Sequence, residues 1–259
     1  MARRDGNARI ASLKAKLEEV RQANAARNAR AGAQIEELKN KLQAVRADAA
    51  GKIKAVQEID AVEHNTAATM DSFFKAIDDE TPYLMFAEAL SEKLASAGVS
   101  FDGKTVADMG TGPGLVLRQI IGSASPAAVS GYDFSATALE HAQSVMPRAT
   151  FAVGNIYTRP ESRFDIVLCT EVLEHLEKPR LALENVLAAV GPRGQAILTV
   201  PDGRLDQSGY HINFWSAESW RNFIMAEAGG FDAEFDQFQF NPKHPRAVSN
   251  IAILTRLND

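Results

Sequence analysis

The stretch VADMGTGPGL, residues 106–115, decides the fold of this chain. An apolar run ends at Asp108, and three glycines, Gly110, Gly112 and Gly114, follow it at every second position. An apolar strand that enters a glycine-rich turn is typical of open parallel sheets, in which ligands bind beyond the carboxyl ends of the strands. A turn without side chains indicates that a ligand approaches the backbone closely.

The spacing of these glycines excludes two common nucleotide-binding motifs. A dinucleotide fingerprint requires its third glycine at position 115, which is Leu115. A phosphate-binding loop ends in Gly-Lys-Ser or Gly-Lys-Thr, and no lysine follows Gly114 in the turn. The pattern G-x-G-x-G therefore favours a ligand that is bulky and not polyanionic.

Outward from this turn, short apolar runs alternate with amphipathic stretches. We expect strands at 104–109, 127–132, 149–153, 164–169 and 194–200, and helices at 114–122, 135–145, 178–190 and 216–228. Such alternation predicts a parallel sheet covered on both faces. Two further strands, 231–240 and 247–257, have no helix between them and should form an antiparallel hairpin at one edge. The expected fold is an α/β, Rossmann-like, doubly wound sheet of seven strands.

A different pattern precedes this domain. Apolar residues recur in steps of three and four, at Ile10, Leu13, Leu17 and Val20 and again at Ile35, Leu38, Leu42 and Val45. Residues 1–62 are therefore expected to form a helical coiled-coil segment, either one long helix with a stutter or two helices hinged at Gly32. Such a narrow stripe needs a partner helix, most simply from a second copy in a dimer.

The alternative is a helix that lies along the chain's own globular domain. That domain is expected to span 66–259, with 66–100 as a helical lead-in or lid. Composition bounds its class: the chain is 46% hydrophobic and 24% charged, as globular proteins are.

Charge and cysteine content limit the partners and the compartment. Residues 1–60 carry a net charge of +5 and the whole chain −5, so the acidic remainder disfavours a broad nucleic-acid contact. The single cysteine, Cys169, and the lack of a secretory signal or a long apolar run favour a cytoplasmic protein without a membrane span.

These motifs together resemble the class I S-adenosylmethionine-dependent methyltransferases, over roughly residues 85–259. VADMGTGPG resembles the family's first motif, and Asp133 in VSGYDFS stands where an acidic residue ends the second strand. GNI, residues 154–156, resembles the third position, where the family often has Asp instead of Asn155. The resemblance implies S-adenosylmethionine as the cofactor, bound by Asp108, Gly110, Thr111, Gly112, Gly114, Asp133, Phe134, Asn155, Ile156 and Thr170.

The resemblance also implies a role for several of these residues. The glycines would lie against the methionine part of the cofactor, with Asp108 oriented toward its amino group. Asp133 would accept hydrogen bonds from the ribose hydroxyls, and Phe134 would pack near the adenine. Asn155 can still offer its carbonyl oxygen to the adenine amino group.

TEVLEHL, residues 170–176, ends the fourth expected strand and contains the pattern E-x-x-E-H. Glu171, Glu174 and His175, with His211 from GYHINFW, carry groups that bind divalent metal ions. The arrangement is similar to that of ubiquinone-biosynthesis O-methyltransferases and small-RNA 2′-O-methyltransferases, in which such residues hold a magnesium-type ion. One interpretation is a metal, such as Mg²⁺, that lowers the pKa of a substrate oxygen. The other is a metal-free site in which His175 or His211 is the general base.

The predicted function is methyl transfer from S-adenosylmethionine to a hydroxyl group of a small-molecule or carbohydrate-like acceptor. Tyr210 and Phe214 flank His211 in the same loop and are expected to contact this substrate. Two alternatives stay open. One is an RNA 2′-O-methyltransferase that contacts the RNA backbone through the basic N-terminal segment. The other is a non-catalytic scaffold or regulatory protein that binds the cofactor.

Overall fold

The computed structural model describes residues 66–75 and 79–257. Five single positions nearer the N-terminus are also described, each helical and exposed: Lys16, Glu18, Gln22, Lys39 and Lys41. The rest of the predicted coiled-coil segment, and with it the predicted dimer, lies outside the described residues. The chain divides into two compact units, Met1–Glu63 and His64–Asp259, and every described strand belongs to the second.

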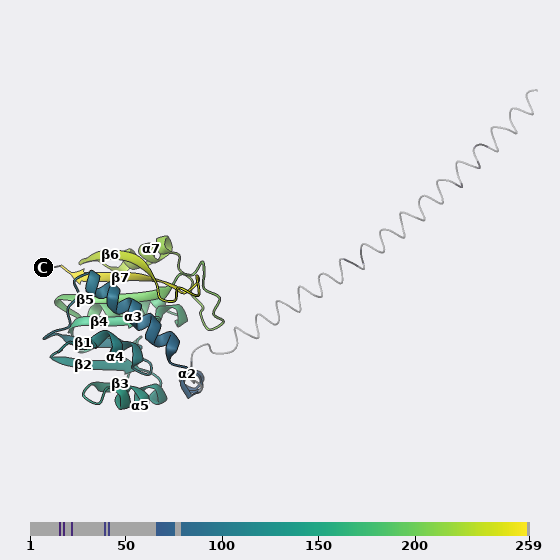
Figure 1. Ribbon diagram of the computed structural model, residues 1–259. Helices are drawn as coiled ribbons and strands as arrows, with labels where there is room; N and C mark the ends of the chain where they lie inside the picture. Colours follow the sequence, from purple (N-terminus) through teal and green to yellow (C-terminus); the bar gives the residue numbers. More distant parts are fainter. Residues whose placement is uncertain are drawn as a thin grey trace, which may run out of the picture. The chain divides into compact units, whose positions relative to one another are not determined.

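A seven-stranded sheet in the order β3-β2-β1-β4-β5-β7-β6 forms the centre of this second unit (Figure 1). Its strands are β1 (Thr105–Met109), β2 (Ala128–Asp133), β3 (Thr150–Val153), β4 (Phe164–Thr170), β5 (Val190–Pro201), β6 (Phe231–Gln239) and β7 (Val248–Arg256). Strands β1 to β5 pair in parallel, whereas β7 pairs antiparallel with both β5 and β6. The predicted parallel sheet and its antiparallel edge hairpin are confirmed.

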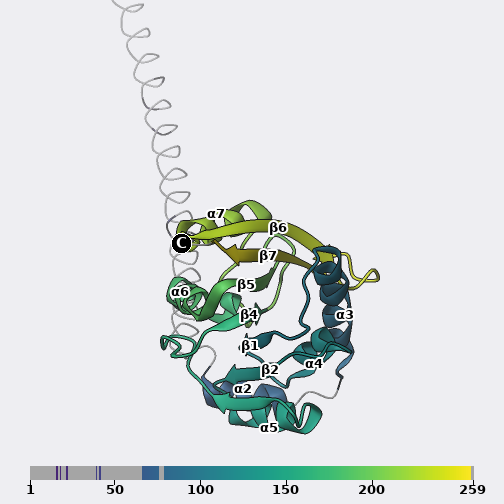
Figure 2. The same cartoon turned by 90° about the vertical axis from the view of Figure 1, so that its left-hand side faces the viewer.

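Helices cover both faces of the sheet (Figure 2). They are α2 (Ala67–Lys75), α3 (Thr81–Ser96), α4 (Leu115–Ile121), α5 (Ala136–Val145), α6 (Pro179–Ala189) and α7 (Ala217–Glu227), with a 3₁₀ turn, η1, at Leu173–His175. Side chains of α3 and α4 pack in one apolar cluster, and those of α6 and α7 pack in another. In β4, Leu168 belongs to the first cluster and its neighbour Cys169 to the second, because successive side chains of a strand point to opposite faces. Among the described residues, no helix is long and apolar enough to cross a membrane.

The predicted helical lead-in contains two helices, α2 and α3. Pro82 lies in the first turn of α3, where the missing backbone N–H would have no helical partner, so it begins a helix there. Helix α3 then buries Phe86, Leu90 and Leu94 and packs against α4, while α2 contacts α5.

Strand β5 begins earlier than its sequence predicts. The pattern indicates a helix to residue 190 and a strand from 194, but α6 ends at Ala189 and Val190 already pairs with Phe164. The β4–β5 register shifts directly after this pair, and Arg193 has a positive φ of 56°. Residues 190–194 therefore form an irregular start to the strand. They belong to β5 because Val190 pairs with β4, and not because of a local sequence pattern.

The carboxyl ends of the parallel strands lie at one edge of the sheet, and two later segments join them there. The loop from β5 to α7 starts at this edge. The turn between β6 and β7 returns to it, because β7 runs antiparallel to β5 and Ser249 pairs with Pro201. Residues from six connections, those that follow β1 to β5 and the turn between β6 and β7, can therefore meet at this edge.

We predict that Ile197→Ala lowers the free energy of unfolding by about 2–5 kcal/mol, because the side chain is fully buried in the central strand β5. The matched control is Val153→Ala at the end of β3, where the side chain is 68% exposed and a change within about 0.5 kcal/mol is expected. Urea unfolding measures both. Equal losses in the two variants would contradict the assigned core.

Candidate functional site

The turn after β1 presents backbone instead of side chains. Gly110, Gly112 and Gly114 have φ values of 85°, 53° and 76°, a left-handed conformation that other residues rarely adopt. A Cβ atom on Gly110 would lie 2.4 Å from Cγ2 of Val172, and one on Gly114 would lie 2.9 Å from Cβ of Ala142. The absence of side chains thus lets the β1 turn pack directly against the loop after β4.

Asp133, at the end of β2, fixes this turn. Its Oδ2 accepts a hydrogen bond from the backbone N–H of Gly112, and its Oδ1 accepts one from that of Ser135, both at 2.9 Å. Burial raises the pKa of Asp133, and these two hydrogen bonds oppose the rise. Ser135 is the N-cap of α5, since its hydroxyl accepts from the backbone N–H of Ala138. Phe134 lies beside them with 38% of its surface exposed.

Asp108 is buried at the end of β1 directly before the turn. It is 2% exposed, and no described residue donates a hydrogen bond to its Oδ1. Burial raises the pKa of this carboxyl group to about 7, the Thr111 hydroxyl opposes the rise, and the charge of Asp133 adds to it. A buried carboxyl group with an unpaired oxygen is suited to receive a cationic group of a ligand.

The remaining predicted cofactor residues follow β3 and end β4. Asn155 is exposed, and its Oδ1 accepts a hydrogen bond from the backbone N–H of Tyr157 at 2.9 Å. The side chain of Asn185 in α6 donates to the carbonyl oxygen of Ile156 at 2.9 Å and so fixes this loop. Thr170 is buried as the last residue of β4.

A strained residue directly after strand β4 redirects the chain. Glu171 has a positive φ of 54°, which is rare for a residue with a side chain. Its backbone N–H donates to the carbonyl oxygen of Thr199 in β5 at 3.0 Å. The chain then turns into η1, which carries Glu174 and His175.

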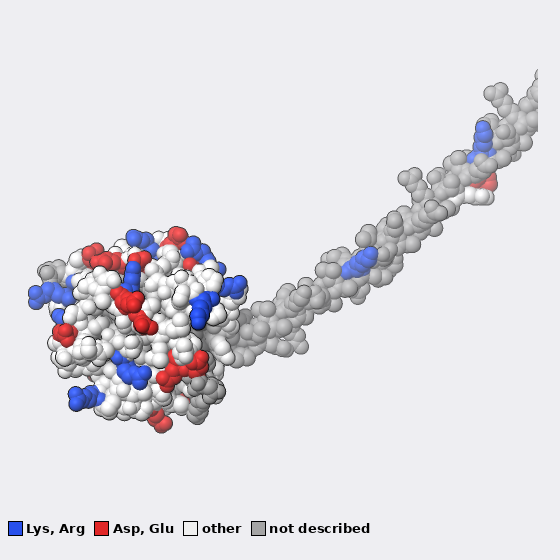
Figure 3. Space-filling model, in the orientation of Figure 1, with Lys and Arg blue, Asp and Glu red and all other residues white. Residues whose placement is uncertain are grey.

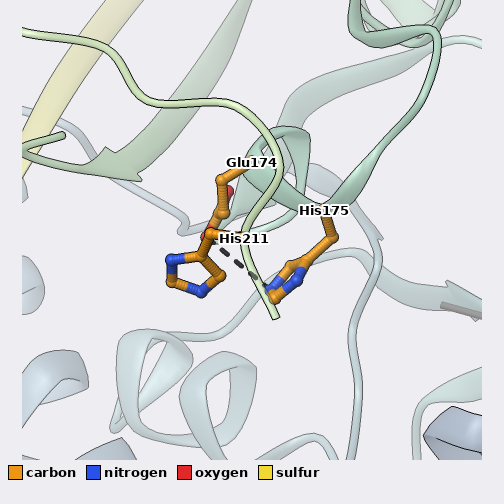
Figure 4. Close-up of side chains that lie close together, drawn as sticks. All are labelled: Glu174, His175 and His211. Atoms are coloured by element: carbon orange, nitrogen blue, oxygen red, sulfur yellow. Dashed lines mark ion pairs between the residues drawn. The ribbon is translucent and has the colours of Figure 1, made fainter. Parts of the chain in front are cut away.

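Three of the four predicted metal-binding residues lie together (Figure 4). Glu174, His175 and His211 each offer one ligand atom, and these atoms lie within 4.8 Å of one another. Glu174 is 1% exposed, and neither of its carboxylate oxygens has a hydrogen-bond partner among the described residues. Nε2 of His175 lies 3.9 Å from Oε1 of Glu174, and the two imidazole centroids are 4.6 Å apart. Glu171 is not one of this group.

Each imidazole is oriented by a partner on its Nδ1 atom. Nδ1 of His175 lies 3.0 Å from the carbonyl oxygen of Tyr210, which can only accept, so Nδ1 carries the proton. Nδ1 of His211 donates in the same way to Oδ2 of Asp206 at 2.5 Å. In the neutral form of each imidazole, Nε2 then carries the lone pair that a metal ligand or a general base requires. Asp206 escapes prediction from the sequence, because an acidic residue in a loop has no diagnostic spacing.

Burial also sets the protonation of this region. It raises the pKa of Glu171 to about 7, and it raises the pKa of Glu174 well above its ordinary value, with the charge of Glu171 as a further cause. It lowers the pKa of His175 to about 4, assisted by His211. His175 is thus neutral near pH 7, the form that binds a metal ion or accepts a proton.

The loop between β5 and α7 exposes apolar side chains beside His211. Tyr210 is 55% and Phe214 is 51% exposed, and both were expected to contact a substrate. The base of the loop is fixed, because the backbone N–H of Gly203 donates to the carbonyl oxygen of Trp215 at 2.9 Å. A glycine is required there, since a Cβ atom on Gly203 would lie 2.6 Å from the backbone of Phe214.

The fold and this glycine turn match a known family. A family model described as a methyltransferase domain matches residues 82–241. The chain belongs to the class I S-adenosylmethionine-dependent methyltransferases. Membership supports S-adenosylmethionine as the cofactor and an enzymatic role, which disfavours the non-catalytic scaffold.

Two curated methyltransferases share part of this sequence. One is a ubiquinone biosynthesis O-methyltransferase of Coxiella burnetii, 29% identical over 103 residues that cover 38% of this chain and 43% of that protein. The other is the mitochondrial ubiquinone biosynthesis O-methyltransferase of Schizosaccharomyces pombe, 33% identical over 107 residues that cover 38% of each. The chain thus spans less than half the length of the curated relatives it matches.

A solved methyltransferase shares the fold. The N-methyltransferase NodS of Bradyrhizobium japonicum, in complex with S-adenosylhomocysteine, has a TM-score of 0.60 to this methyltransferase at 15% identity. The match covers 74% of this chain and 99% of NodS.

We predict that Gly112→Val abolishes binding of S-adenosylhomocysteine by this methyltransferase. Valine is strained at a φ of 53° and places methyl groups where the cofactor would lie against the backbone. Gly229→Val is the matched control. Gly229 follows α7, and a Cβ atom on it would have no neighbour within 4 Å. Calorimetry measures both, with circular dichroism to establish folding. Wild-type affinity in folded Gly112→Val would contradict the assignment of the turn.

Proposed function

We propose that this methyltransferase methylates a hydroxyl group of a small-molecule or carbohydrate-like acceptor, with a divalent ion such as Mg²⁺ held by Glu174, His175 and His211. The observation that carries the proposal is the buried carboxylate of Glu174, whose two oxygens lack a hydrogen-bond partner among the described residues. A buried carboxyl group is costly unless it is hydrogen-bonded, paired or bound to a cation. Two imidazoles offer ligand atoms beside it.

The residues present fit a divalent ion. One carboxylate and two imidazoles form a mixed oxygen and nitrogen donor set, which suits ions such as Mn²⁺ and Fe²⁺ and accommodates Mg²⁺. Tyr210 and Asp206 supply the second hydrogen bonds that ligating histidines commonly make. We propose Glu171 as a fourth ligand, since its Oε1 is buried without a hydrogen-bond partner among the described residues. When bound, the ion would polarise the acceptor oxygen and lower its pKa.

In the cofactor site, we propose that the turn 110–114 lies against the methionine part of S-adenosylmethionine. The unpaired Oδ1 of Asp108 supports a contact with the cofactor's ammonium group. The position of Asp133 at the end of β2 supports hydrogen bonds to the ribose hydroxyls. Phe134 and Asn155, both exposed at this edge, would contact the adenine.

The two histidines are the proposed catalytic residues. Methyl transfer requires the acceptor oxygen in line with the sulfur and the methyl carbon, and removal of its proton. The Nδ1 atoms of His175 and His211 are held as donors, so Nε2 of either residue can take that proton. Without a metal, this general-base role would remain.

The surroundings of the cluster favour a small acceptor. Tyr210 and Phe214 present apolar rings next to His211 and can hold the body of an organic acceptor. On the face drawn in Figure 3, Lys and Arg are interspersed with Asp and Glu and do not form a continuous basic track. An RNA 2′-hydroxyl group is the second candidate, favoured by the exposed Lys243 and Arg246 in the turn between β6 and β7.

A transfer assay with radiolabelled S-adenosylmethionine tests the proposed function. Hydroxylated metabolites and short RNAs are offered as acceptors, each with and without a chelator and with Mg²⁺ restored. We expect transfer to a hydroxylated small molecule that the chelator stops and Mg²⁺ recovers. Transfer that is unchanged by the chelator would rule out the metal, and transfer confined to RNA would replace the acceptor.

We predict that Glu174→Gln weakens Mn²⁺ binding by at least about tenfold, since loss of a residue that only orients a ligand already costs a metal site that much. Glu177→Gln, three residues further in the same loop and exposed, is the matched control and should bind Mn²⁺ as the wild type does. Electron paramagnetic resonance of Mn²⁺ in the presence of S-adenosylhomocysteine measures both. Equal affinity in all three proteins would contradict the assigned ligand.

We predict that S-adenosylmethionine binding releases a proton from Asp108. Because its pKa is raised to about 7, the free protein is largely protonated at this residue below that pH. The cofactor's ammonium group favours the ionised form, so affinity should increase as the pH rises from about 6 to 8. Calorimetry in buffers of different ionisation enthalpy counts the protons. Asp108→Asn should bind more weakly and lose this release; an unchanged proton count in that variant would exclude Asp108 as its source.

A further inference from the structure

The cluster of Glu174, His175 and His211 is assembled from two segments that follow different strands. Glu174 and His175 lie in η1 after β4, whereas His211 lies in the loop between β5 and α7. The pairing of β4 with β5 ends at Thr170 and Thr199, so it does not hold either segment at the cluster. Other contacts must therefore keep the two segments in register.

Asn213 makes most of these contacts. Its side-chain Nδ2 donates to the carbonyl oxygen of Leu176 at 2.7 Å and to that of Leu173 at 3.2 Å. Its backbone N–H donates to the carbonyl oxygen of Glu174 at 3.0 Å, and that of Ile212 donates to the same oxygen at 2.9 Å. One short segment of the loop thus binds the carbonyl groups of η1 and of the residue that follows it.

The remainder of the loop is attached elsewhere, to its own base and, through Gln207, to Arg246 in the turn between β6 and β7. Its base is closed at Gly203 and Trp215, and His211 is bound within the loop to Asp206. Between these points, the described backbone has no helix or strand. A further contact from η1 is that of His175 with the carbonyl oxygen of Tyr210, which itself requires the loop to be in place.

We infer that Asn213 is a positioning residue that attaches the β5–α7 loop to η1 and thereby brings His211 to Glu174 and His175. This inference rests on the proposed function, because the cluster that Asn213 aligns is the proposed metal site. The residue type matters. An amide nitrogen has two N–H donors and can serve two carbonyl oxygens at once, whereas the carboxylate of an aspartate has none.

The test compares Asn213→Ala and Asn213→Asp with wild type, and Asn241→Ala is the matched control. Asn241 is a loop asparagine whose side chain accepts from Lys243, in a turn at the same edge of the sheet. Hydrogen exchange resolved to single amides reports the attachment through Ile212 and Asn213. Electron paramagnetic resonance measures Mn²⁺ affinity, and calorimetry measures S-adenosylhomocysteine affinity.

We expect faster exchange at the Ile212 amide and Mn²⁺ binding that is weaker by about tenfold or more in both Asn213 variants. Amides of β4 and β5 and the affinity for S-adenosylhomocysteine should stay at their wild-type values, as should every property of Asn241→Ala. Asn213→Asp preserves the volume of the side chain and so supplies a folded variant if Asn213→Ala is unstable.

Two outcomes would overturn the inference. Wild-type exchange at Ile212 in either Asn213 variant would show that the amide does not hold the loop. Equal acceleration throughout the sheet would show that Asn213 contributes only general stability. If wild-type protein binds no Mn²⁺, the proposed metal fails, and exchange at Ile212 alone decides whether Asn213 attaches the loop.

Discussion

The close approach of the β1 turn to the loop after β4 is the constraint on which this site depends. No side chain fits on Gly110, because Val172 occupies the space that a Cβ atom would need. Val172 lies between the strained Glu171 and η1, so the same contact links the β1 turn to the segment that carries Glu174 and His175. Asp133 fixes the turn from its other side through Gly112. The glycine turn and the cluster of Glu174, His175 and His211 thereby lie at one edge of the sheet, where we propose that the methyl donor and the acceptor meet.

Two buried carboxyl groups give this edge its chemical character. Asp108 and Glu174 each have an oxygen without a hydrogen-bond partner among the described residues, and burial raises the pKa of both. Such groups destabilise a fold unless a ligand compensates them. An ammonium group at Asp108 and a divalent ion at Glu174 would each offset the free-energy cost of burying the carboxyl group. Binding and stability are thus coupled at both positions.

Local sequence patterns predict the fold and much of the site, whereas contacts between distant segments escape them. The glycine turn and the alternation of strands and helices are short-range signals, and Glu174 and His175 follow from E-x-x-E-H on one strand end. The start of β5 at Val190 is defined by pairing with Phe164, which no local pattern contains. Asp206 and Asn213 act through hydrogen bonds within and between loops, and their residue types are common in any loop.

We propose that the methyl donor and a metal ion share this edge of the sheet. The most direct measurement is nuclear magnetic resonance of S-adenosylmethionine labelled with carbon-13 in its methyl group, bound to the protein and titrated with Mn²⁺. We expect Mn²⁺ to cause strong paramagnetic broadening of the bound methyl signal in the wild-type protein and to leave it sharp in Glu174→Gln. A bound methyl signal that Mn²⁺ leaves unchanged in the wild-type protein would contradict this proposal.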